Sequence, residues 1–218
     1  MKFQDWLPHY ERILADFGFS RTEDERAAEF LANIIKDPMS EQDLCTILRD
    51  ETVAIIGPNT SSKEIREAEE RFGIIIATDS SVKLCMESGC IPHLIATDLD
   101  GDMDFILEAS EDGAICIVHA HGDNVQALQE YVPLVKGRMA GTTQSTPMDT
   151  VHNFGGFTDG DRAVFMAEHC GAKSITLFGF DFERPVKKPS CDLDVKKKKL
   201  GWARYLIEKV IGSYDIKV

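Results

Sequence analysis

The sequence predicts an α/β protein: a Rossmann-like, mostly parallel sheet flanked by helices, with an N-terminal helical segment. Three short apolar runs carry this prediction, at residues 74–76, 94–96 and 115–118. Each run is followed by apolar residues at helical spacing, which is typical of buried parallel strands joined by helices. At 218 residues the chain is long enough for one such domain with a small helical appendage.

Residues 1–50 are expected to form helices. Apolar side chains recur there at helical spacing, beginning with Trp6, Tyr10, Ile13, Leu14 and Phe17. Residues 22–25 have the form of a capping box ahead of a second helix, and Ser40 is expected to cap a third. The segment holds no cluster of reactive side chains, so we expect it to serve in packing or as the interface of a homodimer.

Residues 51–218 are expected to form the α/β catalytic domain. Strands are predicted near residues 53–56, 74–78, 93–97, 114–119, 138–143 and 174–178, with a terminal strand at 214–218. Helices are predicted around 65–72, 80–88, 102–109 and 123–135, after the glycine-rich loop 154–162, and after the polar stretch 183–194. The loop at 57–62 leads from the first strand into a helix, where free N–H groups can bind a phosphate. The alternative is a turn that only caps the helix.

Composition excludes several classes of protein. The net charge of −13 argues against non-specific nucleic-acid binding, which needs a basic face. Lysines at 187, 188 and 196–199 form either a solvated helix face or a group that neutralises phosphates. The six cysteines include no C-x-x-C pair, which argues against zinc knuckles and redox motifs. Because no apolar run resembles a signal peptide or a membrane span, we expect a cytoplasmic protein with free thiols.

Carboxylates follow three successive predicted strands. Asp79 follows the second strand, Asp98 and Asp100 follow the third, and Asp123 follows the fourth. Ligands of an open parallel sheet bind outside the carboxyl ends of its strands, so these acids are expected to converge there. Residues two apart in an extended segment point the same way, so Asp98 and Asp100 can reach one cation. Such oxygen ligands suit Mg²⁺, which usually also holds substrate phosphates.

His119 and His121 alternate with Asp123 in a spacing that suggests a metallohydrolase. That class needs further ligands, and only His152 and His169 remain downstream. We therefore expect His121 to assist a metal or hold substrate, and His119 to be a hydrogen-bonded strand histidine.

The glycine-rich loop at 154–162 enters a helix, and its glycines permit close approach of the backbone to a ligand. Arg162 is expected to contact a phosphate, with a surface salt bridge to Asp159 as the alternative. Thr158 and Asp161 can serve a ligand or only cap the helix. Asp181 lies at the end of a later strand and is a further candidate.

These residues resemble the thiamin pyrophosphokinase-like layout. The shared features are an acid turn at 77–81, a Gly-x-Ile-Pro segment leading to Asp98-Leu-Asp100, and Gly122-Asp123-Asn124 ahead of Ala127-Leu128. The sequence departs from that layout at His93, Thr97 and Gln126, where Asp, Gly and Lys are usual.

The sequence more closely resembles the archaeal 6-hydroxymethyl-7,8-dihydropterin pyrophosphokinase family. It shares the segments Ala96-Thr-Asp-Leu-Asp-Gly101 and His119-Ala-His-Gly-Asp-Asn124, and the Gly-Phe-Asp turn at 179–181. The resemblance covers roughly residues 50–210. The motifs are short, but their order and spacing together are specific.

The resemblance implies transfer of diphosphate from ATP to the hydroxymethyl oxygen of the pterin, with release of AMP, in folate or methanopterin synthesis. It implies small-molecule substrates only, with neither nucleic acid nor a membrane as partner. The expected catalytic residues are Asp98, Asp100 and Asp123, and the expected Mg²⁺ ligands are Asp79, Asp98 and Asp100. Residues expected to bind ATP are Gly57, Asn59, Ser80, Thr158, Arg162 and Lys197. Residues expected to bind the pterin are His121, Asn124, Asp161 and Asp181, with Asp161 or Asp181 facing its amino-pyrimidinone edge.

Three other functions fit parts of the same pattern. A thiamin pyrophosphokinase would carry out the same reaction on another alcohol. A glycosyltransferase would use the D-x-D pair to hold Mn²⁺ and a nucleotide sugar, and would release a nucleoside diphosphate instead of AMP. A non-catalytic protein would bind nucleotide as a partner of the N-terminal helices.

Overall fold

The computed structural model describes residues 1–184 and 193–208, which are built around a sheet of seven strands in the order β6-β5-β4-β3-β2-β1-β7. The strands are β1 (Thr52–Ile56), β2 (Ile74–Thr78), β3 (Leu94–Thr97), β4 (Ile115–Ala120), β5 (Met139–Thr143), β6 (Val151–His152) and β7 (Ser174–Phe178). Every neighbouring pair is parallel. The predicted α/β class is therefore confirmed. Strand β6 was not predicted, because two residues are too short to form a recognisable apolar run.

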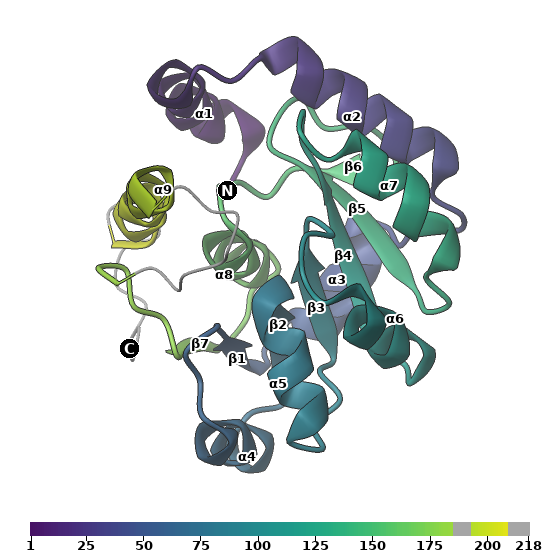
Figure 1. The fold of residues 1–218 in the computed structure, drawn as a ribbon, viewed down its shortest axis with the longest axis vertical. Coiled ribbons are helices and arrows are strands. Elements are labelled where there is room, and N and C mark those ends of the chain that lie inside the picture. The colour runs from purple at the N-terminus through teal and green to yellow at the C-terminus, as the bar shows by residue number, and fades with distance from the viewer. Residues whose placement is uncertain (185–192, 209–218) are drawn as a thin grey trace.

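The helices cover both faces of the sheet (Figure 1). Strands β1 to β5 follow one another in order, so right-handed crossovers put their helices on one face. These are α4 (Ser62–Arg71), α5 (Val82–Glu87), α6 (Met103–Glu111) and α7 (Val125–Tyr131), with the short 3-10 helices η1 (Asp79–Ser81) and η2 (Val132–Leu134). The return to β7, on the far side of β1, puts α8 (Asp159–His169) on the opposite face. The helix predicted at 123–135 is split into α7 and η2 next to Pro133, whose ring nitrogen cannot donate a helical hydrogen bond.

The N-terminal segment forms α1 (Phe3–Phe17), α2 (Arg21–Ile34) and α3 (Glu41–Leu48). Ser40 caps α3 in a capping box, as predicted. The predicted capping box beginning at Thr22 is wrong, because α2 already starts at Arg21 and its first turn is capped by the Ser20 hydroxyl, which accepts from the Glu23 N–H. The chain can turn this early because Gly18 ends α1 in the left-handed region at φ 68°.

These helices share apolar cores with the rest of the chain. Ala27, Ala28 and Leu31 of α2 pack in the same core as strands β4 and β5. Helix α1 lies near α9 (Leu193–Leu206) beside α8 (Figure 1). The contact between them is a third core of Trp6, Tyr10, Ile13, Phe157, Phe165, Trp202 and Leu206. The expected strand at 214–218 and the lysines at 187 and 188 lie outside the described residues. No described helix is both long and apolar enough to cross a bilayer.

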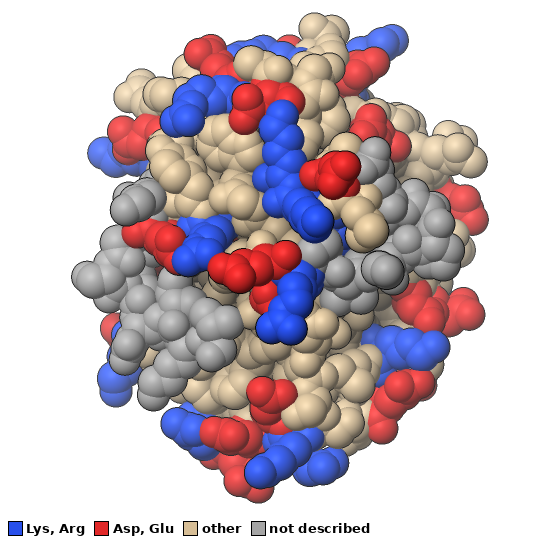
Figure 2. Space-filling view, turned by 60° about the vertical axis from the view of Figure 1, so that its left-hand side comes forward, with Lys and Arg blue, Asp and Glu red and all other residues tan. Residues whose placement is uncertain are grey.

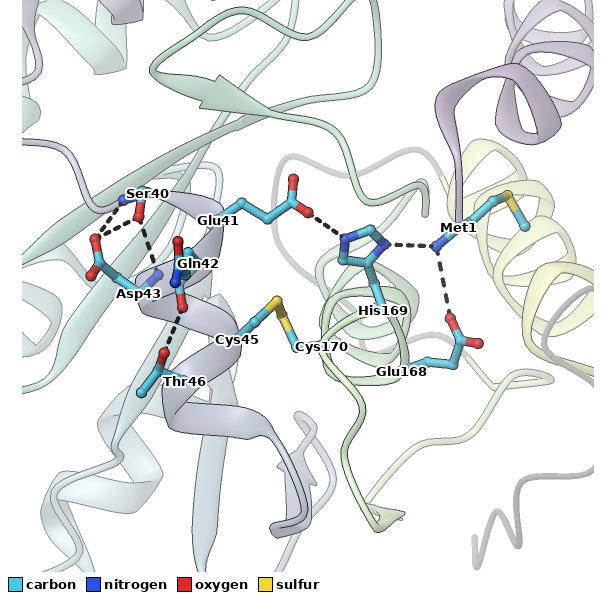
Figure 3. The surroundings of a disulfide bond; sticks show 10 residues. All are labelled: Met1, Ser40, Glu41, Gln42, Asp43, Cys45, Thr46, Glu168, His169 and Cys170. Atoms are coloured by element: carbon cyan, nitrogen blue, oxygen red, sulfur yellow. Dashed lines mark hydrogen bonds and ion pairs between the residues drawn. A yellow bond between two sulfur atoms is a disulfide. The ribbon is translucent and has the colours of Figure 1, made fainter.

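A disulfide joins Cys45 of α3 to Cys170 at the end of α8 (Figure 3). The expectation of free thiols is therefore wrong for this pair, whereas Cys85, Cys90 and Cys116 are free and buried. The two linked cysteines are 125 residues apart, and only the packing of α3 against α8 brings them together. A close pair between Glu41 and His169, 2.7 Å apart, lies beside the bond and joins the same two helices.

Candidate functional site

Three carboxylates meet at the carboxyl edge of the sheet, as the sequence predicted. Asp79 follows β2, and Asp98 and Asp100 follow β3; one oxygen from each lies within 4.8 Å of the others. This is the one potential metal-binding group of three or more His, Cys, Asp or Glu side chains found in residues 1–184 and 193–208. His119, His121 and Asp123 form no such group among these residues, which agrees with the rejection of a metallohydrolase site.

The D-x-D pair converges for a different reason from the one expected. The segment is not extended, because Leu99 between the two acids has φ 67° and lies in the left-handed region. This conformation is costly for a branched side chain and is typical of functional turns. Leu99 is held there by its buried side chain and by its N–H, which donates to the Thr97 hydroxyl at 2.8 Å.

The cluster is electrostatically unfavourable without a cation. Burial and the nearby charge of Asp159 raise the pKa of the Asp79 carboxyl well above its ordinary value. Burial would also raise the pKa of Asp98, but the hydrogen bond and charge of His121, aided by Arg162, hold it below its ordinary value. Asp79 Oδ2 and Asp98 Oδ1 are buried and have no hydrogen-bond partner among the described residues. Oxygen atoms without partners in a group of three carboxylates fit a hard divalent cation such as Mg²⁺.

A large pocket of about 420 Å³ opens in front of the cluster. Its walls come from the loops after β1, β2, β3 and β7, the start of α8, and α9. The basic residues lining it are Arg162, Arg184, Lys196 and Lys199, and the acidic ones include Asp79, Asp98, Asp100 and Asp159. Figure 2, which brings the side of α1 and α9 forward, shows Lys and Arg side chains interleaved with Asp and Glu.

A small pocket of about 180 Å³ lies beside the large one. The turn between α1 and α2 and the first turn of α2 form one wall, through Phe19, Glu23 and Asp24. The loops after β4 and β5 form the other wall, through His121, Asp123 and Gln144. Asp98, Phe157, Arg162 and Lys199 line both pockets, so the two cavities meet at the acidic cluster.

Comparisons with known proteins identify the family of the chain. Residues 40–186 match the family described as 6-hydroxymethylpterin diphosphokinase MptE-like. A relative from Pyrococcus furiosus named 6-hydroxymethyl-7,8-dihydropterin pyrophosphokinase is 41% identical over all of this chain and 98% of its own length. Relatives of the same name from Methanothermobacter thermautotrophicus and Methanocaldococcus jannaschii are 40% and 35% identical, each over the whole of this chain and 99% of their own.

The chain belongs to the MptE-like family of 6-hydroxymethylpterin diphosphokinases. The family assignment made from the short motifs is thereby confirmed. The relatives match the N-terminal helices as well, so the family relationship covers the whole chain and not only the part that contains the motifs.

In this diphosphokinase-family chain, two N–H groups of the loop after β1 that were expected to bind a phosphate are hydrogen-bonded within the protein. The N–H of Gly57 donates to the Phe178 carbonyl, and that of Asn59 donates to the Gly179 carbonyl. These donors, at 2.8 Å and 3.1 Å, tie the loop to the end of β7 and are not free for a phosphate. These bonds favour the alternative, a structural turn. Asn59 in this loop and Ser80 after β2 both line the large pocket.

The polar side chains at the start of α8 are also hydrogen-bonded within the protein. The Asp161 carboxylate accepts the N–H groups of Phe157 at 2.6 Å and Thr158 at 2.8 Å, and the Thr158 hydroxyl. Both of its oxygens thus cap the helix, although Asp161 borders the large pocket. Arg162 pairs with Asp159 at 3.6 Å and donates to the Phe157 carbonyl at 2.7 Å. The pair with Asp159 was expected on the surface, but Arg162 is buried between the two pockets.

The residues at the end of β4 and in the segment after it have different roles. Asn124 was expected to bind substrate, but its amide donates to the carbonyls of Asp98 and His119 and accepts from the His121 N–H. Its side chain therefore braces the loops after β3 and β4 and lines neither pocket. Asp123 is exposed at the small pocket and is not part of the three-carboxylate group. His119 is buried against the Thr142 hydroxyl, as a hydrogen-bonded strand histidine; burial holds its pKa well below the ordinary value.

Helix α9 presents different lysines from the one expected. Lys196 and Lys199 line the large pocket, whereas Lys197 does not. Residues three apart share a helix face, so 196 and 199 point together while 197 is turned away. Asp181 lines the large pocket, where its carboxylate accepts the N–H groups of Glu183 and Arg184 and pairs with the Arg184 side chain.

Sequence reasoning missed the contribution of the N-terminal helices. Asp24 is buried and accepts the Gly122 N–H at 2.8 Å, the Tyr10 hydroxyl at 2.7 Å and the Gln144 amide at 2.8 Å. It therefore ties α1, α2 and the loops after β4 and β5 together at the small pocket. No local pattern signals this role, because Asp24 in sequence looks like an ordinary acid in the first turn of a helix.

Proposed function

We propose that this chain transfers diphosphate from ATP to the hydroxymethyl group of 6-hydroxymethyl-7,8-dihydropterin, releases AMP, and requires Mg²⁺. The observation that carries the proposal is the pair of pockets that meet at Asp98, in a chain of the 6-hydroxymethylpterin diphosphokinase family. A diphosphokinase must hold two substrates with their reacting atoms adjacent, and two cavities with a common wall provide that arrangement.

The large pocket suits ATP. Its volume of about 420 Å³ exceeds that of the small pocket, and its basic residues Arg162, Lys196 and Lys199 can neutralise a polyphosphate. Asp98 and Asp100, which line this pocket, would hold the metal together with Asp79. Mg²⁺ held by these carboxylates would supply positive charge that neutralises the charge developing on the phosphates during transfer.

The reaction needs positioning more than a strong base. The hydroxymethyl oxygen attacks the β-phosphorus, the bond from that phosphorus to the oxygen bridging it to the α-phosphate breaks, and AMP leaves with that oxygen. Arg162 and Lys199 border both pockets and are suited to hold the diphosphate as it passes from ATP to the pterin. His121 Nε2 lies 3.4 Å from Asp98 Oδ2 and the His121 ring lines the small pocket, so the Asp98–His121 pair is placed to take up the hydroxyl proton.

A competition assay tests the substrate assignment. With ATP, Mg²⁺ and equal concentrations of the reduced pterin and thiamin, we expect the pterin diphosphate and AMP to be the dominant products. The expectation rests on the family and on a small pocket lined by carboxylates, which suits a heterocycle with adjacent N–H donors. Mass spectrometry of the products is the measurement. Thiamin diphosphate as the main product would make this a thiamin pyrophosphokinase. Release of a nucleoside diphosphate in a parallel assay with nucleotide sugars would indicate a glycosyltransferase.

Millimolar Mg²⁺ is expected to raise the melting temperature, and more so with a non-hydrolysable ATP analogue. The cation relieves repulsion among Asp79, Asp98 and Asp100, which are within 4.8 Å of one another. A ligand that binds only the folded state stabilises it by about 2.7 kcal/mol at a concentration of 100 times its Kd. The measurement is a thermal melt with Mg²⁺, and with Na⁺ at equal ionic strength as control. A melting temperature that responds equally to both salts contradicts a specific site.

A further inference from the structure

The two pockets differ in the charges that surround them. The large pocket carries four basic side chains, at Arg162, Arg184, Lys196 and Lys199. The small pocket adds three carboxylates beyond the shared residues, at Glu23, Asp24 and Asp123, and contributes no basic side chain of its own. The large pocket also carries six carboxylates, at Asp79, Asp98, Asp100, Asp159, Asp161 and Asp181. The first three form the candidate metal site, where a bound cation would offset their charge and leave the four basic side chains to attract a polyanion. The small pocket has no basic side chain except the two that it shares, so its own three carboxylates disfavour a polyanion. The small pocket therefore suits an uncharged ligand that donates hydrogen bonds.

The carboxylates of the small pocket are not equally available. Asp24 already accepts three hydrogen bonds, from Gly122, Tyr10 and Gln144. The Glu23 side chain is exposed and makes no hydrogen bond or ion pair with the described residues. No described residue therefore occupies either oxygen of the Glu23 carboxylate, and both can accept hydrogen bonds from a ligand.

The backbone and Cβ of Glu23 are fixed by close packing. A Cβ atom at Gly122 would lie 2.7 Å from the Glu23 Cβ, so the first turn of α2 rests directly on the turn after β4. The hydrogen bond from the Gly122 N–H to Asp24 locks the same contact at 2.8 Å. A carboxylate on so firmly held a backbone can recognise a planar ligand without the cost of ordering a loop.

Aromatic rings complete the small pocket. Phe19 and Phe157 lie 6.4 Å apart between centroids, at an interplanar angle of 49°. The Lys199 ammonium lies over both rings, 5.9 Å and 5.8 Å from their centroids. The rings offer apolar surface to a flat heterocycle, and Lys199 marks the side on which the small pocket joins the large one.

We propose that the pterin ring binds in the small pocket, and that Glu23 of the N-terminal helices accepts the paired N–H donors of its amino-pyrimidinone edge. The inference rests on the proposed function, and it adds the location and the recognising residue. It moves that role from Asp161 and Asp181, which border the large pocket and whose carboxylates accept backbone N–H groups. The hydroxymethyl group then faces Asp98 and His121, toward the diphosphate donor.

The test compares Glu23→Gln with Glu29→Gln, a control on the exposed side of the same helix that lines neither pocket. Loss of a hydrogen bond to a charged acceptor should weaken pterin binding by about 10- to 100-fold in Glu23→Gln. The KM for ATP, the melting temperature and the properties of Glu29→Gln should stay at wild-type values. Glu23→Asp should recover part of the loss.

A second ligand gives an independent result. The analogue with an oxo group in place of the 2-amino group should bind wild type poorly, because it presents an acceptor to the Glu23 carboxylate. Glu23→Gln should reduce this preference, because an amide can donate to the oxo group. Equal preference for the amino compound in wild type and Glu23→Gln overturns the assignment.

Titration calorimetry without ATP separates this inference from the proposed function. A wild type that binds the pterin through Glu23 but releases no AMP contradicts the reaction and supports the pocket. A wild type that forms the pterin diphosphate and whose Glu23→Gln variant binds the pterin unchanged contradicts the pocket and supports the reaction. A wild type that does not bind the pterin overturns both.

Discussion

Asp98→Asn and Asp100→Asn are each expected to lower kcat by at least about 10²-fold, a loss of roughly 2.7 kcal/mol of transition-state stabilisation. Each change keeps the shape of the side chain and removes a negative charge at the point where the two pockets meet the acidic cluster. The neutral amide is a much weaker ligand for Mg²⁺ than a carboxylate. Asp98→Asn should have the additional effect of removing the negative charge beside His121, 3.4 Å away.

The measurement is AMP release at saturating ATP and pterin over a series of Mg²⁺ concentrations. Asp104→Asn is the matched control, because Asp104 is an exposed acid in the first turn of α6 and lines neither pocket. The control should keep wild-type turnover. If both cluster variants turn over at near wild-type rates at saturating Mg²⁺, these carboxylates do not carry the reaction.

Replacing both Cys45 and Cys170 by alanine is expected to lower the free energy of unfolding by up to about 5 kcal/mol, given a separation of 125 residues. A cross-link between such distant residues removes many conformations from the unfolded chain, and in that way it favours the folded one. Because α3 and α8 are held together by this bond, their contact should loosen first.

Denaturant unfolding with and without dithiothreitol provides the measurement and its control. The reductant should lower the stability of wild type to that of the double variant and leave the double variant unchanged. Wild type that is insensitive to complete reduction, confirmed by thiol titration, would show that the bond contributes nothing to stability.

The fold could be predicted from the sequence because its strands are local signals. Strands such as β2 and β4 are buried along their whole length, so their residues are apolar and contiguous. The acids after these strands were predicted to converge for the same reason, since parallel strands end at one edge. Asp79, Asp98 and Asp100 do converge.

The rest depends on contacts between distant parts of the chain. From sequence, the loop at Gly57 resembles a phosphate-binding loop. Only the position of β7 beside β1 shows that the N–H groups of Gly57 and Asn59 are hydrogen-bonded to the end of β7. Cys45 and Cys170 carry no pairing signal until α3 is known to pack on α8. Glu23 belongs to the small pocket only because α2 lies on the turn at Gly122. The convergence of Asp98 and Asp100 was predicted, but the backbone conformation that produces it was not. Nothing in the sequence signals that Leu99 lies in the left-handed region.

The position of β7 has a consequence for synthesis on the ribosome. Strand β1 pairs with β2 on one side soon after it emerges, but its other neighbour, β7, begins about 120 residues later in the chain. At ordinary translation speeds that interval lasts on the order of ten seconds, during which an apolar strand edge stays unpaired. Such an edge invites pairing with another nascent chain. The arrival of β7, which begins four residues after Cys170, therefore closes this edge and brings Phe180, Asp181 and Phe182 to the wall of the large pocket.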